Sequence, residues 1–165
     1  MGDGAALDPA RKILDLEHAR RWRADARGTV VFTNGVFDVL HRGHVGMLAR
    51  ARAEGNHLIV AVNSDASARR LGKGANRPIN GARDRAIVVA ALESVDVVVV
   101  FDEDTPRALI EALQPDVLAK GADYRLEDIV GADAVVQRGG RVVRVPLEPG
   151  FSTTDFLKKV TRGEA

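Results

Sequence analysis

Apolar residues along this chain occur in two alternating patterns. Short runs rich in β-branched residues, such as 29–33 (Thr-Val-Val-Phe-Thr), predict strands. Segments with an apolar residue every three or four positions, such as 45–53, predict helices. The expected strands cover 29–33, 57–62, 95–101, 116–119 and 141–145. The expected helices cover 14–26, 45–53, 64–71, 82–92, 105–113, 127–137 and 152–160.

Strands that alternate with helices through short connections predict an α/β fold: a doubly wound five-stranded parallel sheet with helices on both faces, which is Rossmann-like. The run 95–101 is almost unbroken by polar residues, which favours a central strand. We expect one domain over 1–165, with a disordered start at 1–10 and an N-terminal helical extension at 11–28, anchored by Trp22. Ligands of such sheets bind beyond the carboxyl ends of the strands.

Composition narrows the class of protein. Lys and Arg number 24 against 23 Asp and Glu, so the charge balance gives no support to a nucleic-acid or membrane-surface partner. The absence of cysteine excludes disulfides and thiolate zinc sites. No apolar run approaches the roughly 20 residues of a membrane span, and the first residues lack a signal-peptide pattern. We expect a cytoplasmic protein that acts on small molecules.

The segment 33–44 (Thr-Asn-Gly-Val-Phe-Asp-Val-Leu-His-Arg-Gly-His) lies between the first strand and the next helix. His41 and His44 are three residues apart, so both rings lie on one side of a first helical turn. Gly43 would let an anion approach the backbone amides. These histidines could equally be surface residues or half of a metal site, although a zinc site would need further ligands.

This segment resembles the His-x-Gly-His signature of the cytidylyltransferase-like nucleotidyltransferase superfamily. The resemblance implies that His41 and His44 contact a nucleoside triphosphate and stabilise its pentacoordinate transition state. The acceptor phosphate is already ionised at neutral pH, so catalysis would reduce to alignment and charge stabilisation.

A second segment, 150–156 (Gly-Phe-Ser-Thr-Thr-Asp-Phe), precedes the last expected helix. Ser152 alone would be explained as a helix cap. Three successive hydroxyl residues together with free amides instead favour a phosphate site. The superfamily has a Ser-Thr-Thr run at this place, and here it is intact.

Two loops offer further contacts. The loop 72–78 holds Lys73 and Arg77 among glycines and a proline, which is compatible with a solvated loop or with a cationic lid. In relatives, a loop lysine and the arginine that matches Arg85 contact substrate phosphates, whereas Arg83 matches the family less well. The segment 120–124 follows the fourth strand and could be an ordinary turn or a nucleoside-contacting loop.

Within the superfamily, the chain is similar over 12–162 to the adenylyltransferase half of bifunctional ADP-heptose synthases. It shares Arg77-Pro78, 120–124 (Lys-Gly-Ala-Asp-Tyr) and the Ser-Thr-Thr run, although Ala122 replaces a usual glycine. The length leaves no room for the fused sugar kinase, so we expect the stand-alone form. The resemblance implies transfer of AMP from ATP to D-glycero-D-manno-heptose 1-phosphate for lipopolysaccharide core or a related glycan, with Mg²⁺ held through the triphosphate, and a homodimer.

The resemblance also implies a set of site residues, with no protein ligand to a metal. The catalytic residues would be His41, His44, Lys73 and Arg85. The nucleotide-binding residues would be Thr33, Asn34, Gly35, Phe37, Gly43, His44, Lys120, Gly121, Asp123, Ser152, Thr153 and Thr154. The residues that bind the acceptor substrate would be Asp38, Asn63, Lys73 and Arg77.

Other functions stay open. Leu147-Glu148-Pro149 lacks the arginine of glycerol-phosphate cytidylyltransferases, which weakens a cytidylyl alternative. No residue physically selects adenine over guanine, so a cytidylyl- or guanylyltransferase acting on another phosphorylated sugar or alcohol remains. A catalytically silent nucleotide-binding regulator is the alternative from another class. A flavin-type dinucleotide dehydrogenase is disfavoured, because the first strand is not followed by the glycine fingerprint.

Overall fold

The computed structural model describes residues 8–72 and 77–151, together with Thr153, Phe156, Val160 and Arg162. The strands are β1 (Val30–Gly35), β2 (His57–Asn63), β3 (Val97–Phe101), β4 (Val117–Gly121) and β5 (Arg141–Val145). The α-helices are α1 (Leu16–Asp25), α2 (Arg42–Arg52), α3 (Asp65–Arg70), α4 (Ala82–Ala90), α5 (Arg107–Leu113) and α6 (Ala132–Gln137). Two 3-10 turns are η1 (Pro9–Lys12) and η2 (Leu126–Asp128).

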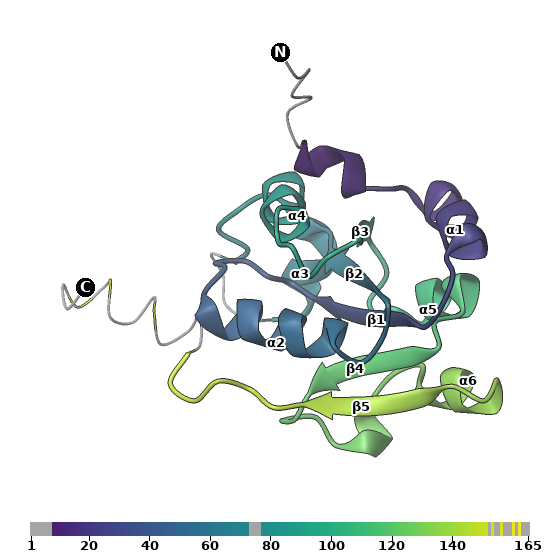
Figure 1. Cartoon of the computed structure of the whole chain (residues 1–165). Helices are drawn as coiled ribbons and strands as arrows, with labels where there is room; N and C mark the ends of the chain where they lie inside the picture. Colours follow the sequence, from purple (N-terminus) through teal and green to yellow (C-terminus); the bar gives the residue numbers. More distant parts are fainter. Residues whose placement is uncertain are drawn as a thin grey trace, which may run out of the picture.

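The five strands form one parallel sheet in the order β3-β2-β1-β4-β5, which confirms the predicted doubly wound fold (Figure 1). The chain builds β1, β2 and β3 toward one edge and then returns to place β4 and β5 on the other side of β1. The strand order therefore switches between β1 and β4. In open α/β sheets, a crevice opens at the carboxyl ends of the strands at such a switch.

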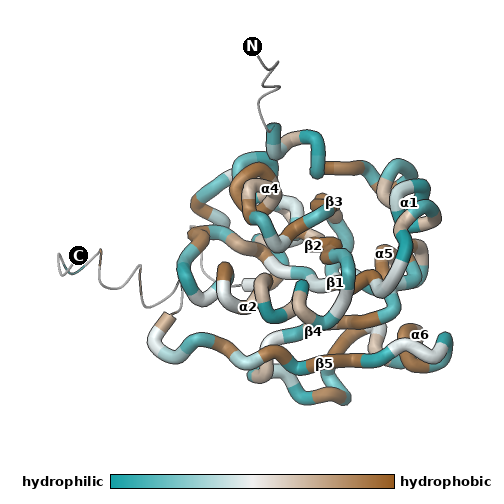
Figure 2. Tube along the Cα trace, in the orientation of Figure 1, coloured by the Kyte–Doolittle hydropathy of each residue, from teal (hydrophilic) through white to brown (hydrophobic). Residues whose placement is uncertain are grey.

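Apolar side chains fill both faces of the sheet. Brown, hydrophobic residues recur along the strands in Figure 2. One core cluster joins the sheet to α2 and α4, for example through Leu48 and Val89. The other joins it to α1, α5 and α6, for example through Ala19, Ile110 and Val135. Because helices cover both faces, every strand except β5 is largely buried.

The prediction of a central strand at 95–101 is wrong, because β3 lies at an edge of the sheet. Val97, Val98 and Val99 are buried by the helices above and below the sheet rather than by strands on both sides, whereas Val100 is exposed. The N-terminal segment covers part of its open edge: Ile13 forms a parallel bridge with Val98, and the Leu14 N–H donates to the Val98 carbonyl over 2.9 Å. An apolar run thus indicates that both faces of a strand are buried, but it does not indicate where the strand lies in the order of the sheet.

Several boundaries differ from the sequence prediction. Helix α2 begins at Arg42, which places His44 in its first turn. The expected helix over 127–137 is divided, because Gly131 adopts a positive φ of 85° at the start of α6. Residues 1–7 lie outside the described residues, whereas Pro9–Lys12, expected in part to be disordered, form a 3-10 turn. Trp22 packs on the second core cluster, as expected.

Gly131→Ala should destabilise the fold more than Gly139→Ala. Both glycines have a positive φ, of 85° and 83°. That conformation alone costs about 1–2 kcal/mol for an L side chain. A Cβ at Gly131 would also lie 2.6 Å from Ile110 Cδ1, whereas a Cβ at Gly139 meets open space. Overpacking of this kind adds about 1–3 kcal/mol.

Urea unfolding of the two variants measures this difference. Equal losses in the free energy of unfolding would mean that the Ile110 contact relaxes freely and that only backbone strain matters.

Candidate active site

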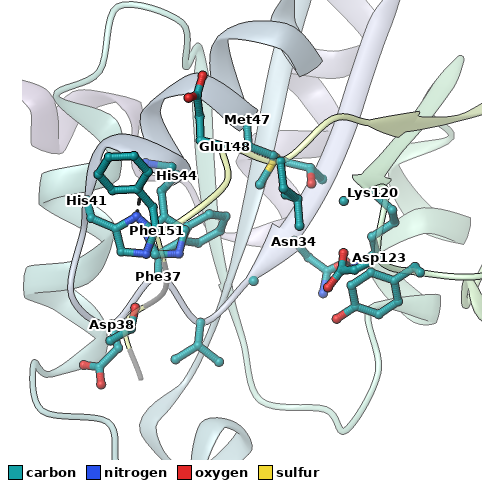
Figure 3. Close-up of a pocket in the computed structure, with 18 of the residues that line it drawn as sticks. Asn34, Phe37, Asp38, His41, His44, Met47, Lys120, Asp123, Glu148 and Phe151 are labelled. Carbon is teal, nitrogen blue, oxygen red and sulfur yellow. Dashed lines mark hydrogen bonds between the residues drawn. The ribbon is translucent and has the colours of Figure 1, made fainter. Parts of the chain in front are cut away.

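A pocket of about 330 Å³ lies at the carboxyl edge of the sheet, at the switch between β1 and β4. This volume is at the lower end of that of small-molecule sites. Four separate stretches of chain form its wall. Three of them are seen in Figure 3: the end of β1 with the start of α2, the end of β4, and the segment after β5. The fourth is the segment before α4, through Arg77. The lining residues are Thr33, Asn34, Gly35, Val36, Phe37, Asp38, His41, Gly43, His44, Met47, Arg77, Lys120, Gly121, Asp123, Tyr124, Leu147, Glu148, Phe151 and Thr153.

His41 is the N-cap of α2, and its Nδ1 accepts a hydrogen bond from the Gly43 N–H over 3.1 Å. When the ring is neutral, this bond leaves the proton on Nε2, which is then a donor. The helix begins here because His41 has extended dihedrals and a side chain that can bind an orphan amide of the first turn. The sequence motif therefore also fixes the tautomer of its own histidine.

The rings of His41 and His44 stack, with centroids 3.9 Å apart and 23° between their planes. The Phe37 ring packs edge-on against the His44 ring, with the two ring centroids 5.4 Å apart. Burial lowers the pKa of His41, because the charged imidazolium loses hydration there. Two positive charges at this spacing would repel each other. At neutral pH the pair consequently presents a neutral N–H donor from His41 at the positive end of α2.

The chain after β5 returns to the histidines. Phe151 stacks on His41 at 6.4 Å, and the Arg42 guanidinium lies 5.5 Å from the Phe151 ring centre. Thr153 Oγ1 lies 3.4 Å from the Val39 carbonyl, to which it donates. A Cβ at Gly43 would lie 3.0 Å from both His41 and Phe151, so a larger residue here would press these two side chains apart. The histidine motif and the described part of the hydroxyl run therefore share one pocket.

The other end of the pocket is built around Lys120, which is 8% exposed. Its ammonium donates to Asn34 Oδ1, and both residues are labelled in Figure 3. The ammonium also lies 5.3 Å from the ring centre of Tyr124. A Cβ at Gly121 would come 2.5 Å from Asp123 Oδ1, so this turn accepts only glycine without rearrangement. The pocket thus has a histidine end and a lysine end, joined by the last residues of β1.

Thr33 lies at the bottom of the pocket between these ends. Its side chain is buried, and within the described part of the chain its Oγ1 has no hydrogen-bond partner. A buried hydroxyl without a partner costs free energy unless a ligand or water supplies one. Its position in the wall makes it available to a bound substrate.

Asp38 and Arg77 form an ion pair in the wall at the histidine end, with Arg77 Nε 2.6 Å from Asp38 Oδ2. The Asp38 carboxylate has no exposed surface. Its Oδ1 also accepts the backbone N–H groups of Ile79 and Asn80, over 2.8 and 3.0 Å. The carboxylate therefore holds the segment before α4 against the loop after β1.

Two predicted site residues, Asn63 and Arg85, do not line the pocket. Asn63 is buried and its Nδ2 donates to Ser67 Oγ over 2.9 Å. Arg85 is 1% exposed, and its guanidinium donates to the carbonyls of Val36, Asn63 and Asn80. It also pairs with Asp65 at 2.8 Å. Since their polar atoms bind protein groups, the geometry gives both residues a supporting place rather than a place in the pocket wall.

Three further predicted residues, Lys73, Ser152 and Thr154, lie outside the described residues. The remaining ones line the pocket: Thr33, Asn34, Gly35, Phe37, Asp38, His41, Gly43, His44, Arg77, Lys120, Gly121, Asp123 and Thr153.

Sequence reasoning did not select Val36, Met47, Tyr124, Leu147, Glu148 or Phe151, which also line the pocket. Tyr124 and Phe151 adjoin selected residues and could have been found from the motifs. Glu148 had no local signal, because its place depends on Arg50, 2.6 Å away on α2. The hydrogen bond from Arg50 holds the pKa of Glu148 below its ordinary value, so it adds a fixed negative charge to the pocket rim.

Among the described residues, no group of three or more His, Cys, Asp or Glu side chains could hold a metal ion. In the same part of the chain, no helix is long and apolar enough to cross a membrane.

Comparison with known proteins places these features in a family. Residues 32–159 match the model of the cytidylyltransferase-like family. The chain is 55% identical to the bifunctional protein HldE of Mesorhizobium japonicum, over 92% of this chain and 31% of the relative. It is 51% identical to that of Granulibacter bethesdensis, over 97% and 32%. The chain thus spans about a third of the length of these curated relatives.

Solved structures of other proteins are also similar to this chain. The crystal structure of the lipopolysaccharide core biosynthesis protein from Thermoplasma volcanium is 27% identical, with a TM-score of 0.61 over 73% of this chain and 97% of the other. Pantoate-beta-alanine ligase from Francisella tularensis, at 14% identity and a TM-score of 0.59 over 93% of this chain and 78% of the other, shares the fold. The family match covers the histidine motif, the lysine end and the returning tail, and the chain therefore belongs to the cytidylyltransferase-like family of nucleotidyltransferases.

Proposed function

We propose that this chain transfers AMP from ATP to D-glycero-D-manno-heptose 1-phosphate and releases pyrophosphate, forming ADP-heptose. The similarity to ADP-heptose synthases in 120–124 and the Ser-Thr-Thr run supports this substrate pair. Identities of 55% and 51% to HldE proteins, and the likeness to a lipopolysaccharide core biosynthesis protein, support a role in the synthesis of ADP-heptose for lipopolysaccharide core. The observation that carries the proposal is the convergence of His41, His44 and Thr153 on one pocket at the strand-order switch.

In the proposed reaction, a phosphate oxygen of the sugar attacks the α-phosphorus of ATP. The new P–O bond forms as the bond to the β-phosphate breaks, and pyrophosphate takes the electron pair. The attacking oxygen is ionised at neutral pH, so the protein needs to supply alignment rather than a general base.

The histidine end suits the charge that develops at the α-phosphorus. N–H donors from His41 and His44, together with the amides at the start of α2, would stabilise oxygens of the transition state. The tail residues Ser152, Thr153 and Thr154 would hold the leaving pyrophosphate, and Lys73 and Arg77 the phosphates of either substrate. The lysine end, with Asn34, Lys120 and Asp123, would receive the nucleoside, with Thr33 and Gly35 between the two ends.

A magnesium ion would be held by the triphosphate oxygens, where it would neutralise charge. Assembly as a homodimer, which the resemblance implies, and a cytoplasmic location, which the sequence led us to expect, belong to the same proposal.

The proposed function predicts pyrophosphate release from ATP only when heptose 1-phosphate is present. ATP, CTP and GTP would be offered separately with the sugar phosphate, and pyrophosphate measured by a coupled assay. We expect ATP to be used in preference to the other two. Preferential use of CTP or GTP would transfer the assignment to a sister activity, and tight ATP binding without turnover on any sugar phosphate would favour a regulatory module.

His44→Ala should lower kcat by at least about 100-fold, the scale for loss of one donor to a transition-state oxygen. His18→Ala is the matched control, because His18 is exposed on α1 and does not line the pocket. Steady-state kinetics with both substrates measures the effect. An H44A enzyme with an unchanged kcat would remove the proposed role.

A further inference from the structure

The ion pair between Asp38 and Arg77 differs from the other arginine–carboxylate pairs near the pocket. Arg77 lines the pocket, and its side chain is 16% exposed, while the Asp38 side chain is fully buried. By contrast, the Arg50 and Glu148 side chains, which pair at the pocket rim, are 41% and 23% exposed. A buried carboxylate loses less of its attraction for a guanidinium to water than an exposed carboxylate does.

The surroundings of Asp38 fix its carboxylate. Oδ1 accepts two backbone N–H groups, from Ile79 and Asn80. The Asn80 side chain donates to the Asp38 carbonyl over 2.7 Å, and the Asn80 carbonyl accepts from Arg85 Nε over 2.9 Å. Arg85 also donates to the Val36 carbonyl. Asp38 is thus fixed through its Oδ1 and its backbone carbonyl. Its second oxygen, Oδ2, lies 2.6 Å from Arg77 Nε in an ion pair without hydrogen-bond geometry.

The contact leaves the end of the guanidinium available. Arg77 approaches Asp38 through Nε, and among the described residues its two terminal amino groups form no ion pair or hydrogen bond, so they can donate to a ligand. Planar amino groups of an oriented arginine match the oxygens of a phosphate. A lone arginine following a glycine-rich stretch would sample many rotamers and would bind phosphate less well.

We infer that Asp38 is a positioning residue, not a ligand of substrate, and that it orients Arg77 to bind the phosphate of the acceptor sugar. The inference rests on the proposed function, which supplies a sugar phosphate as the acceptor. From the sequence we expected Asp38 to contact the acceptor substrate directly. We infer instead that Asp38 acts on the substrate only by orienting Arg77.

A double-mutant cycle tests the inference with the wild type, Asp38→Asn, Arg77→Ala and the double variant. Asn keeps the shape of Asp38 and an oxygen for the Ile79 and Asn80 amides but removes the charge that holds Arg77. We expect D38N to raise the KM for heptose 1-phosphate about 10-fold, the size for a weakened hydrogen bond to a charged group, and to change kcat less. In the R77A background, D38N should change the KM by less than about 2-fold.

The same increase in both backgrounds would show that Asp38 acts without Arg77 and would overturn the inference. A lower KM in D38N would also overturn it, because Asp38 would then only weaken the positive charge of the pocket. Arg107→Ala, which removes an arginine–aspartate pair away from the pocket, is the control and should leave the KM unchanged.

The dissociation constant of inorganic phosphate, measured by calorimetry on the same four proteins, separates this inference from the proposed function. If the wild type does not turn over heptose 1-phosphate, the proposed function fails, and phosphate affinity still reports the coupling between Asp38 and Arg77. If D38N does not fold, Asn80→Ala loosens the same carboxylate by deleting one hydrogen bond to the Asp38 backbone. N80A should then weaken phosphate binding only while Arg77 is present, and an equal effect in the R77A background would overturn the inference.

Discussion

The buried guanidinium of Arg85 joins three segments at the carboxyl edge of the sheet. It donates to Val36 after β1, to Asn63 at the end of β2 and to Asn80 before α4, and it pairs with Asp65 at the start of α3. Such a buried charge is tolerated only when every donor has a partner, so each loop must lie where its oxygen meets the guanidinium. The pocket wall at Val36 and Asp38 is built on this contact, although Arg85 is not in the wall.

The histidine motif combines a helix start with a donor pair. His41 caps α2 with the same ring that stacks on His44, and Phe37 lies under the pair with a positive φ of 49°. A non-glycine residue in that conformation is strained, and strain of this kind persists where surrounding contacts compensate for it. Here the Phe37 ring packs beneath the catalytic candidate His44, so the strained backbone supports the orientation of the histidines.

The pocket also depends on contacts between residues about a hundred positions apart. Arg50 on α2 holds Glu148 at 2.6 Å, and Phe151 lies against His41 and Arg42. These contacts bring the segment after β5 back over α2, where it closes the histidine end. In the proposed reaction, this closure would place the Thr153 hydroxyl and the two imidazoles near one polyphosphate, and the lysine end would receive the nucleoside.

The sequence by itself determined the α/β class, the parallel sheet and most pocket residues, because strand periodicity, helix periodicity and the motifs at 33–44 and 120–124 are local patterns. It could not determine that β3 is an edge strand, since three of its four valines are buried by helices on both faces, and burial alone does not reveal which strands are neighbours. It could not reveal that Arg85 and Asn63 bind protein groups, or that Glu148 lines the pocket. Those assignments depend on which oxygens and nitrogens from distant segments come within hydrogen-bond distance, and only the tertiary structure decides that.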